Sequence, residues 1–123
     1  MLNLNSVLVF SENPQILTEF YKKVLGREPK WTGGEFVGFM LCDGYLTIGP
    51  HDKVKGKSQN PDRIMFNFET EDVEGEFARI KGLGAEVIAE PYHPGEEPDM
   101  WVATFADPDG NYFQLLSPMP KSN

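Results

Sequence analysis

Residues 106–116 read Ala-Asp-Pro-Asp-Gly-Asn-Tyr-Phe-Gln-Leu-Leu, which predicts a tight turn that leads into a β-strand. Pro108 fixes φ for a turn, and the Asp-Gly-Asn sequence that follows it tolerates left-handed backbone. The residues at 112–116 suit a half-buried strand, but Gln114 is polar and stands between two apolar neighbours. Because successive strand residues point to opposite faces, we expect Gln114 to lie on the face away from the core. That face is the predicted functional surface.

The composition indicates one compact domain with a hydrophobic core. The chain has 123 residues, of which 40% are hydrophobic and 12% aromatic. The formal net charge of −8 argues against a nucleic-acid backbone or an anionic membrane as the main partner. It is compatible with a neutral or cationic small molecule.

The cysteine content and the N-terminus favour a cytoplasmic location. Cys42 is the one cysteine, so the chain forms no internal disulfide, which fits a reducing compartment. Residues 1–5 lack the basic and long apolar regions of a signal peptide, and no apolar stretch approaches the length of a membrane span. We therefore expect a soluble cytoplasmic protein.

The first half of the chain predicts a strand, a helix and three further strands. Residues 6–10 form an apolar run typical of a buried strand. Asn13 and Pro14 suit the start of a helix, and Gly26 suits its end. The pairs Gly33-Gly34 and Asp43-Gly44 then separate three strand-like runs, which predicts a meander. The expected elements are a helix at 14–25, with an apolar stripe of Ile16, Leu17, Phe20, Tyr21 and Val24, and strands at 29–32, 35–41 and 45–49.

The second half repeats this order. A strand is predicted at 64–69 and a helix from Asp72 to Gly84, weakened by Gly75 within it. Strands follow at 85–90, 100–106 and 112–116, with a proline-rich loop at 91–99. Such a duplication predicts two modules of one domain, at about 5–50 and 63–117, joined by an exposed linker at 51–62.

Several signatures of the chain resemble the vicinal oxygen chelate superfamily, which holds glyoxalase I, the extradiol dioxygenases and the bleomycin- and fosfomycin-resistance proteins. They are Asn13-Pro14 through Leu25-Gly26, Asp72 to Gly84, and Asp107 through Leu115. The resemblance spans about residues 5–118. It implies an α+β fold of two βαβββ modules, with strands curled into a cup. It also implies a homodimer, because modules of this family pair within or between chains.

The resemblance further implies where a metal would bind. In metal-using members, histidine and glutamate ligands stand on the first and last strands of each module, on the inner face of the cup. Counting and strand alternation place Ser6, Thr47, Met65 and Gln114 at these positions. This set offers no imidazole and no carboxylate, which makes a poor site for a divalent metal. The sequence therefore predicts no metal and no cofactor, and it identifies no catalytic residue.

The favoured function is the binding of a small molecule without a metal, similar to the bleomycin-resistance type. Polar side chains would orient the ligand, aromatic rings would stack on it, and the acidic chain would favour a cation. Glu69 is the one acidic group placed near the cavity, and Trp101 could close over a ligand. The predicted binding residues are Ser6, Leu8, Phe10, Tyr45, Thr47, Met65, Asn67, Glu69, Trp101, Tyr112 and Gln114.

Two other functions stay open from the sequence. One is a metal-dependent lyase, isomerase or dioxygenase of the same superfamily, which needs ligands that the four positions do not supply. The other is a metal-free enzyme or regulatory partner, with Glu69 or His51 as the candidate acid or base. A loop metal site around His93 is a weaker reading, because the neighbouring prolines favour a rigid or lid-like loop.

Overall fold

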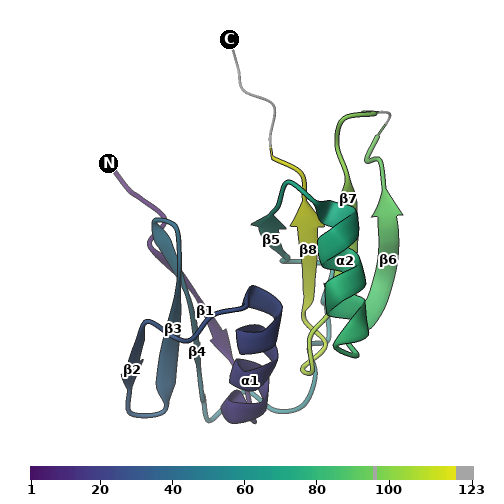
Figure 1. Ribbon diagram of the computed structural model, residues 1–123. Helices are drawn as coiled ribbons and strands as arrows, with labels where there is room; N and C mark the ends of the chain where they lie inside the picture. The colour runs from purple at the N-terminus through teal and green to yellow at the C-terminus, as the bar shows by residue number, and fades with distance from the viewer. Residues whose placement is uncertain (96, 119–123) are drawn as a thin grey trace. The chain divides into compact units, whose positions relative to one another are not determined.

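The protein consists of two compact units, Met1–Lys57 and Ser58–Asn123. A computed structural model describes residues 1–95 and 97–118. Each unit holds a four-stranded mixed sheet and one helix (Figure 1), so the fold is α+β and contains two βαβββ modules. The elements in chain order are β1 (Ser6–Phe10), α1 (Pro14–Leu25), β2 (Trp31–Gly33), β3 (Phe36–Leu41), β4 (Gly44–Gly49), β5 (Phe66–Glu69), α2 (Val73–Gly82), β6 (Glu86–Tyr92), β7 (Val102–Ala106) and β8 (Tyr112–Leu116).

The two sheets share one topology, which confirms the predicted repeat. The strand order is β1-β4-β3-β2 in the first unit and β5-β8-β7-β6 in the second. In each unit the first strand pairs in parallel with the last, and the remaining pairs are antiparallel. A helix links the first strand to the meander, as a parallel strand pair requires a crossover connection.

Helix α1 covers one face of the first sheet. Pro14 occupies its first turn, and Gly26 ends it in the left-handed conformation with φ of 66°. Leu17, Tyr21 and Val24 are buried, together with Val9, Phe39, Leu46 and Ile48 of the sheet. The predicted stripe is wrong at Ile16, which is 60% exposed, because the buried face of the helix is centred on Leu17, Tyr21 and Val24 and Ile16 lies to one side of it.

Helix α2 covers one face of the second sheet, over a cluster of aromatic rings. The ring centroids of Phe77 and Phe105 lie 5.2 Å apart, and those of Phe105 and Phe113 lie 5.6 Å apart. Phe105 and Phe113 are fully buried. Stacked and tilted aromatic pairs at these separations stabilise a core beyond their buried area.

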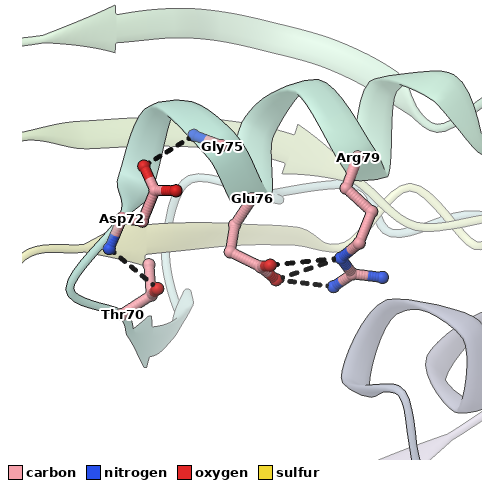
Figure 2. Close-up of polar contacts among 5 residues, drawn as sticks. All are labelled: Thr70, Asp72, Gly75, Glu76 and Arg79. Atoms are coloured by element: carbon pink, nitrogen blue, oxygen red, sulfur yellow. Dashed lines mark hydrogen bonds and ion pairs between the residues drawn. The ribbon is translucent and has the colours of Figure 1, made fainter.

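The N-terminus of α2 explains the glycine inside this helix (Figure 2). The main-chain nitrogen of Gly75 donates to Oδ1 of Asp72 at 2.9 Å, and that of Asp72 donates to Oγ1 of Thr70 at 3.1 Å. A Cβ atom on residue 75 would overlap the Asp72 carboxylate, so glycine permits the close cap. One turn later, Arg79 Nη2 lies 2.7 Å from Glu76 Oε2. The predicted weakening by Gly75 is thus offset by the cap.

The turn before β8 is built around one buried carboxylate. Asp107 is 5% exposed, and its Oδ1 accepts from the main-chain nitrogens of Asp109 at 2.9 Å and Asn111 at 3.0 Å. The Asn111 side-chain amide donates to Oδ2 at 3.0 Å. Gly110 has φ of 79°, the left-handed backbone that the sequence predicts. The stretch that identifies the fold is thus an internally bonded turn.

Element bounds differ from the prediction in the second unit. Strand β5 begins at Phe66, so Met65 lies before it, and β6 continues to Tyr92 in the predicted proline-rich loop. Pro91 is tolerated there because β6 is an edge strand. Among the described residues, no helix has the length and hydrophobicity needed to cross a membrane.

Candidate functional site

Each sheet has one face that its helix does not cover, and most of the predicted binding residues lie on these faces. We call them the first and the second open face. In the first unit, β1 pairs with β4 so that Ser6 faces Tyr45 and Leu8 faces Thr47. Strand alternation from these pairs assigns the whole first open face, and every position on it is uncharged. Its residues are Ser6, Leu8, Phe10, Trp31, Gly33, Phe36, Gly38, Met40, Tyr45, Thr47 and Gly49.

Aromatic rings lie over the glycines of the first open face. Trp31 pairs with Gly38 across β2 and β3, and a Cβ atom on Gly38 would overlap Nε1 of the indole and lie 2.5 Å from its Cε2. A Cβ atom on Gly33 would lie 3.5 Å from Cζ3 of the same indole. Phe36 likewise lies over Gly49. The absence of side chains at these glycines is what lets the rings approach the backbone.

A second group of rings continues this layer. Phe10 contacts Phe36 edge to face with centroids 6.3 Å apart, and it contacts His51 at 5.0 Å. Nδ1 of His51 accepts from the main-chain nitrogen of Lys53 at 3.1 Å. That bond leaves the proton of a neutral His51 on Nε2. Phe10 and His51 thus lie together at one end of β1 and β4.

The second open face is polar at its centre. Asn67, Gln114 and Thr104 are neighbours across β5, β8 and β7. Nε2 of Gln114 donates to Oγ1 of Thr104 at 3.1 Å, which fixes the amide orientation. Asn67 is exposed and Gln114 is half-buried. This row presents hydrogen-bonding groups without a formal charge.

The remaining predicted residues of the second unit divide between its two faces. Register places Glu69 opposite Leu116 and Tyr112 opposite Ala106, which puts Glu69 and Tyr112 on the second open face. Trp101 extends the β7–β8 pairing, since the Ser117 nitrogen donates to its carbonyl oxygen at 3.1 Å. Alternation therefore groups Trp101 with the helix-covered face. Its ring contacts His93 with centroids 4.0 Å apart.

The donor set at the implied metal-ligand positions does not fit a divalent metal. Ser6 and Thr47 offer neutral hydroxyls, and Thr47 is only 5% exposed. In the second unit, Met65 offers a thioether and Gln114 an amide that is already bonded to Thr104. Across residues 1–95 and 97–118, no three His, Cys, Asp or Glu side chains gather as a metal site would require. Hard cations need anionic oxygen ligands, and zinc or iron needs imidazole, thiolate or carboxylate.

The negative charge of the chain is concentrated in the second unit. Thirteen of the nineteen Asp and Glu residues but only four of the eleven Lys and Arg residues lie at 58–123. Such a field attracts cations and repels anions.

The pKa of Lys22 is raised by hydrogen bonds from its ammonium group to Glu28 and Glu19. Lys22 and Glu19 belong to α1 and Glu28 follows it, so all three groups lie in the first unit.

A surface depression of about 500 Å³ lies elsewhere, at the N-terminus of α1. Most of its lining side chains are exposed, and Val37 belongs to the helix-covered face. None of the predicted binding residues borders it. Its lining comprises Glu12, Asn13, Pro14, Gln15, Ile16, Thr32, Gly34, Glu35 and Val37.

Sequence reasoning missed part of both open faces. Phe36 and Gly38 could have been placed by the alternation along 36–41, which puts Phe39 on the opposite face. The position of Trp31 depends on its pairing with Gly38, and that of Thr104 on its pairing with Gln114. Cross-strand pairing leaves no mark in the local sequence, so no signal marked these two contacts.

The fold agrees with many solved structures of one group. A glyoxalase/bleomycin resistance protein/dioxygenase family enzyme from Burkholderia phytofirmans PsJN is 19% identical, with a TM-score of 0.76, over 96% of this chain and 100% of its own. A glyoxalase-related enzyme from Fulvimarina pelagi is 13% identical, with a TM-score of 0.77, over 96% of this chain and 89% of its own. The fosfomycin resistance protein FosX from Listeria monocytogenes is 22% identical, with a TM-score of 0.65, over 97% of this chain and 93% of its own.

Comparison of the sequence with protein families and with curated proteins gave different results. No curated protein was found to be similar to this chain. The family described as a glyoxalase-like domain matches residues 6–116, which extends from the start of β1 to the end of β8. The chain therefore belongs to the glyoxalase-like domain family, within the vicinal oxygen chelate superfamily.

Proposed function

We propose that the protein binds a small cationic or aromatic molecule on the second open face, without a metal. The observation that carries the proposal is the composition of this face. It presents the amide of Gln114 beside Thr104 and Asn67, and Tyr112 lies on the same face. Small-molecule sites combine apolar walls with a few placed polar groups.

The polar row of the second open face supplies orientation. The bond to Thr104 uses one proton of the Gln114 amide, and its carbonyl oxygen Oε1 has no donor among the described residues. That oxygen accepts a hydrogen bond from a ligand N–H or O–H. Glu69 adds a carboxylate on the same face, which favours a cationic ligand.

The comparisons support this proposal at the level of the fold. FosX is named as a fosfomycin resistance protein, and the Burkholderia structure is named for a family that includes bleomycin resistance proteins. Both names refer to small molecules. Identities of 19% and 22% support a shared fold alone, and the proposed ligand chemistry rests on the residues of the second open face.

Binding is tested by screening cationic and aromatic compounds by thermal shift and calorimetry in the presence of EDTA. A ligand at 100 times its Kd stabilises the protein by about 2.7 kcal/mol, which raises Tm by several degrees. We expect at least one compound to bind with 1:1 stoichiometry. Finding no ligand, or ligands that bind only after a metal is added back, would contradict the proposal.

The location of the ligand is tested by two matched substitutions. Gln114→Leu removes the placed amide from the second open face and should weaken binding roughly tenfold, since a lost hydrogen bond in a desolvated site costs about 1–3 kcal/mol. Gln15→Leu makes the same change at the depression beside α1 and should leave the affinity unchanged. Loss of binding in Gln15→Leu alone would place the ligand at the depression instead.

We also propose a homodimer and a cytoplasmic location. Neither unit has more than four strands to bury, and small sheets commonly gain stability by association. Light scattering at micromolar concentration measures the mass directly, and a monomer would exclude the dimer. Fractionation of cells that express the chain tests its location.

A further inference from the structure

Nδ1 of His51 lies within reach of two partners that need opposite protonation states of that atom. It is 3.1 Å from the main-chain nitrogen of Lys53, whose N–H donates to it, and 3.3 Å from Oδ1 of Asp52. The bond from Lys53 needs the lone pair of an unprotonated Nδ1, whereas the contact with Asp52 needs a proton there. The two interactions therefore exclude one another.

The bond to Nδ1 belongs to a small turn that follows β4. The main-chain nitrogen of Val54 donates to the carbonyl oxygen of His51 at 3.1 Å, which closes the turn. Two residues later, the nitrogen of Gly56 donates to Oε1 of Glu12 at 3.0 Å. The ring of His51 packs against Phe10, with centroids 5.0 Å apart. A change at Nδ1 therefore acts on a bonded segment whose position is fixed on both sides.

The charges around His51 are few. Among the residues that the structure describes, Asp52 is the one carboxylate within ion-pair distance of the imidazole. Strand β1, which packs against the ring, contributes the uncharged Phe10. Farther along the segment lie the ammonium group of Lys53 and the carboxylate of Glu12, which is bonded to Gly56. The His51 side chain is 41% exposed, so protons reach it directly from water.

The second histidine of the chain makes a bond of the opposite kind. Nδ1 of His93 lies 2.7 Å from the carbonyl oxygen of Met100. Because a carbonyl oxygen only accepts, His93 carries a proton on Nδ1 in its neutral and its charged form alike, and its bond survives protonation. The bond of His51 does not survive it, because an imidazolium has no lone pair left on Nδ1.

From this geometry we propose that His51 is a pH-sensitive switch of the turn that follows β4. In the neutral form Nδ1 accepts from Lys53 and the turn is closed. When a proton from water binds Nδ1, the new N–H donates to Asp52, and the N–H of Lys53 faces another donor, loses its acceptor and moves away. The inference goes beyond the proposed binding function, and it is tested on the protein without a ligand.

The protonation sites at pH 8 test the starting state. Long-range ¹H–¹⁵N spectra of the imidazole rings distinguish a proton on Nδ1 from one on Nε2. We expect the neutral His51 to carry its proton on Nε2 and the neutral His93 to carry it on Nδ1. A proton on Nδ1 of His51 at pH 8 would overturn the inference.

A titration from pH 8 to pH 4 tests the switch itself. The amide signal of Lys53 should move with the same midpoint as the ring protons of His51. Its protection from exchange with water, corrected for the intrinsic rate at each pH, should fall about fivefold, the equivalent of one exposed hydrogen bond. The amide of Tyr45, which donates to the Asn5 carbonyl oxygen at 3.0 Å, should keep its protection. A Lys53 signal that stays in place while His51 titrates would contradict the switch.

Two matched variants assign the transition to one histidine. His51→Asn keeps a side-chain acceptor two residues before Lys53 but does not titrate, so the Lys53 amide should stay in place throughout. His93→Asn should leave the transition as it is in the unchanged protein. The inference fails if the transition persists in His51→Asn or disappears in His93→Asn. It also fails if the midpoint lies below pH 5, where a carboxylate such as Asp52 would be the titrating group.

Discussion

Replacement of Asp107 by alanine should destabilise the second unit strongly. The Asp107 carboxylate is almost fully buried and accepts from the main-chain nitrogens of Asp109 and Asn111 at 2.9 and 3.0 Å, and from the Asn111 side chain. Without it, two main-chain donors in a part-buried turn lose their acceptor. Each such loss costs about 1–3 kcal/mol, so we expect a loss of about 3 kcal/mol in the free energy of unfolding. Typical domains have about 5–15 kcal/mol in all.

The Asp107→Asn variant should destabilise the second unit less than Asp107→Ala does. Its amide oxygen replaces Oδ1 as acceptor for both main-chain donors, while its NH₂ group opposes the amide of Asn111. We expect a loss of about 1 kcal/mol. Asp43→Ala is the matched control, because Asp43 occupies the corresponding Asp-Gly turn of the first unit and is exposed. Its effect should stay within about 0.5 kcal/mol.

Urea unfolding measures these differences. Trp101 lies in the second unit, so its fluorescence in a Trp31→Phe background follows that unit, and far-UV circular dichroism follows the whole chain. The midpoint should fall in the order Asp43→Ala, Asp107→Asn, Asp107→Ala, with the slope unchanged. An Asp107→Ala midpoint equal to that of the unchanged protein would refute the reasoning that this turn is held by its internal carboxylate.

Three further outcomes are expected. Asp72→Ala removes the N-cap of α2 and should lower the free energy of unfolding by about 1 kcal/mol in urea titrations, whereas Asp72→Asn, which keeps an acceptor, should lower it less. Phe105→Ala, at a fully buried ring between two others, should cost about 3–5 kcal/mol by the same measurement, and a smaller loss would show that the core refills the cavity. Glu28 and Glu19 raise the pKa of Lys22, so NMR titration should find that pKa above the ordinary lysine value. The small stabilisation of the fold by these ion pairs should be present at neutral pH and lost as the pH rises through the raised pKa. An unshifted Lys22 titration would contradict the ion pairs.

Much of the architecture followed from local sequence. The helix at 14–25 and the strands at 6–10 and 112–116 were predicted with the bounds that the structure shows. Proline and glycine at the helix ends, and Asp-Gly at the turns, fix backbone conformation over a few residues, so they can be recognised without neighbours. Strand alternation likewise placed Gln114 opposite the core, and Phe113 is indeed fully buried.

Prediction from the sequence alone was less accurate where burial depends on residues far away in the chain. Ile16 fits the apolar stripe of α1 but is 60% exposed, and Met65 belongs to an apolar run that pairs only from Phe66 onward. In both cases the local pattern includes a residue that the partner element does not cover or pair with. A periodicity carries no information about the extent of that partner.

The chain by itself thus determined its family, its repeated module and the chemical types at the implied metal positions, because these reside in residue identity and local spacing. Tertiary structure decided which groups meet. Trp31 comes to rest on Gly38, and Gln114 donates to Thr104, because β2 pairs with β3 and β7 with β8 in one particular register. Register is set by the packing of each sheet against its helix, so these two contacts exist only in the folded chain.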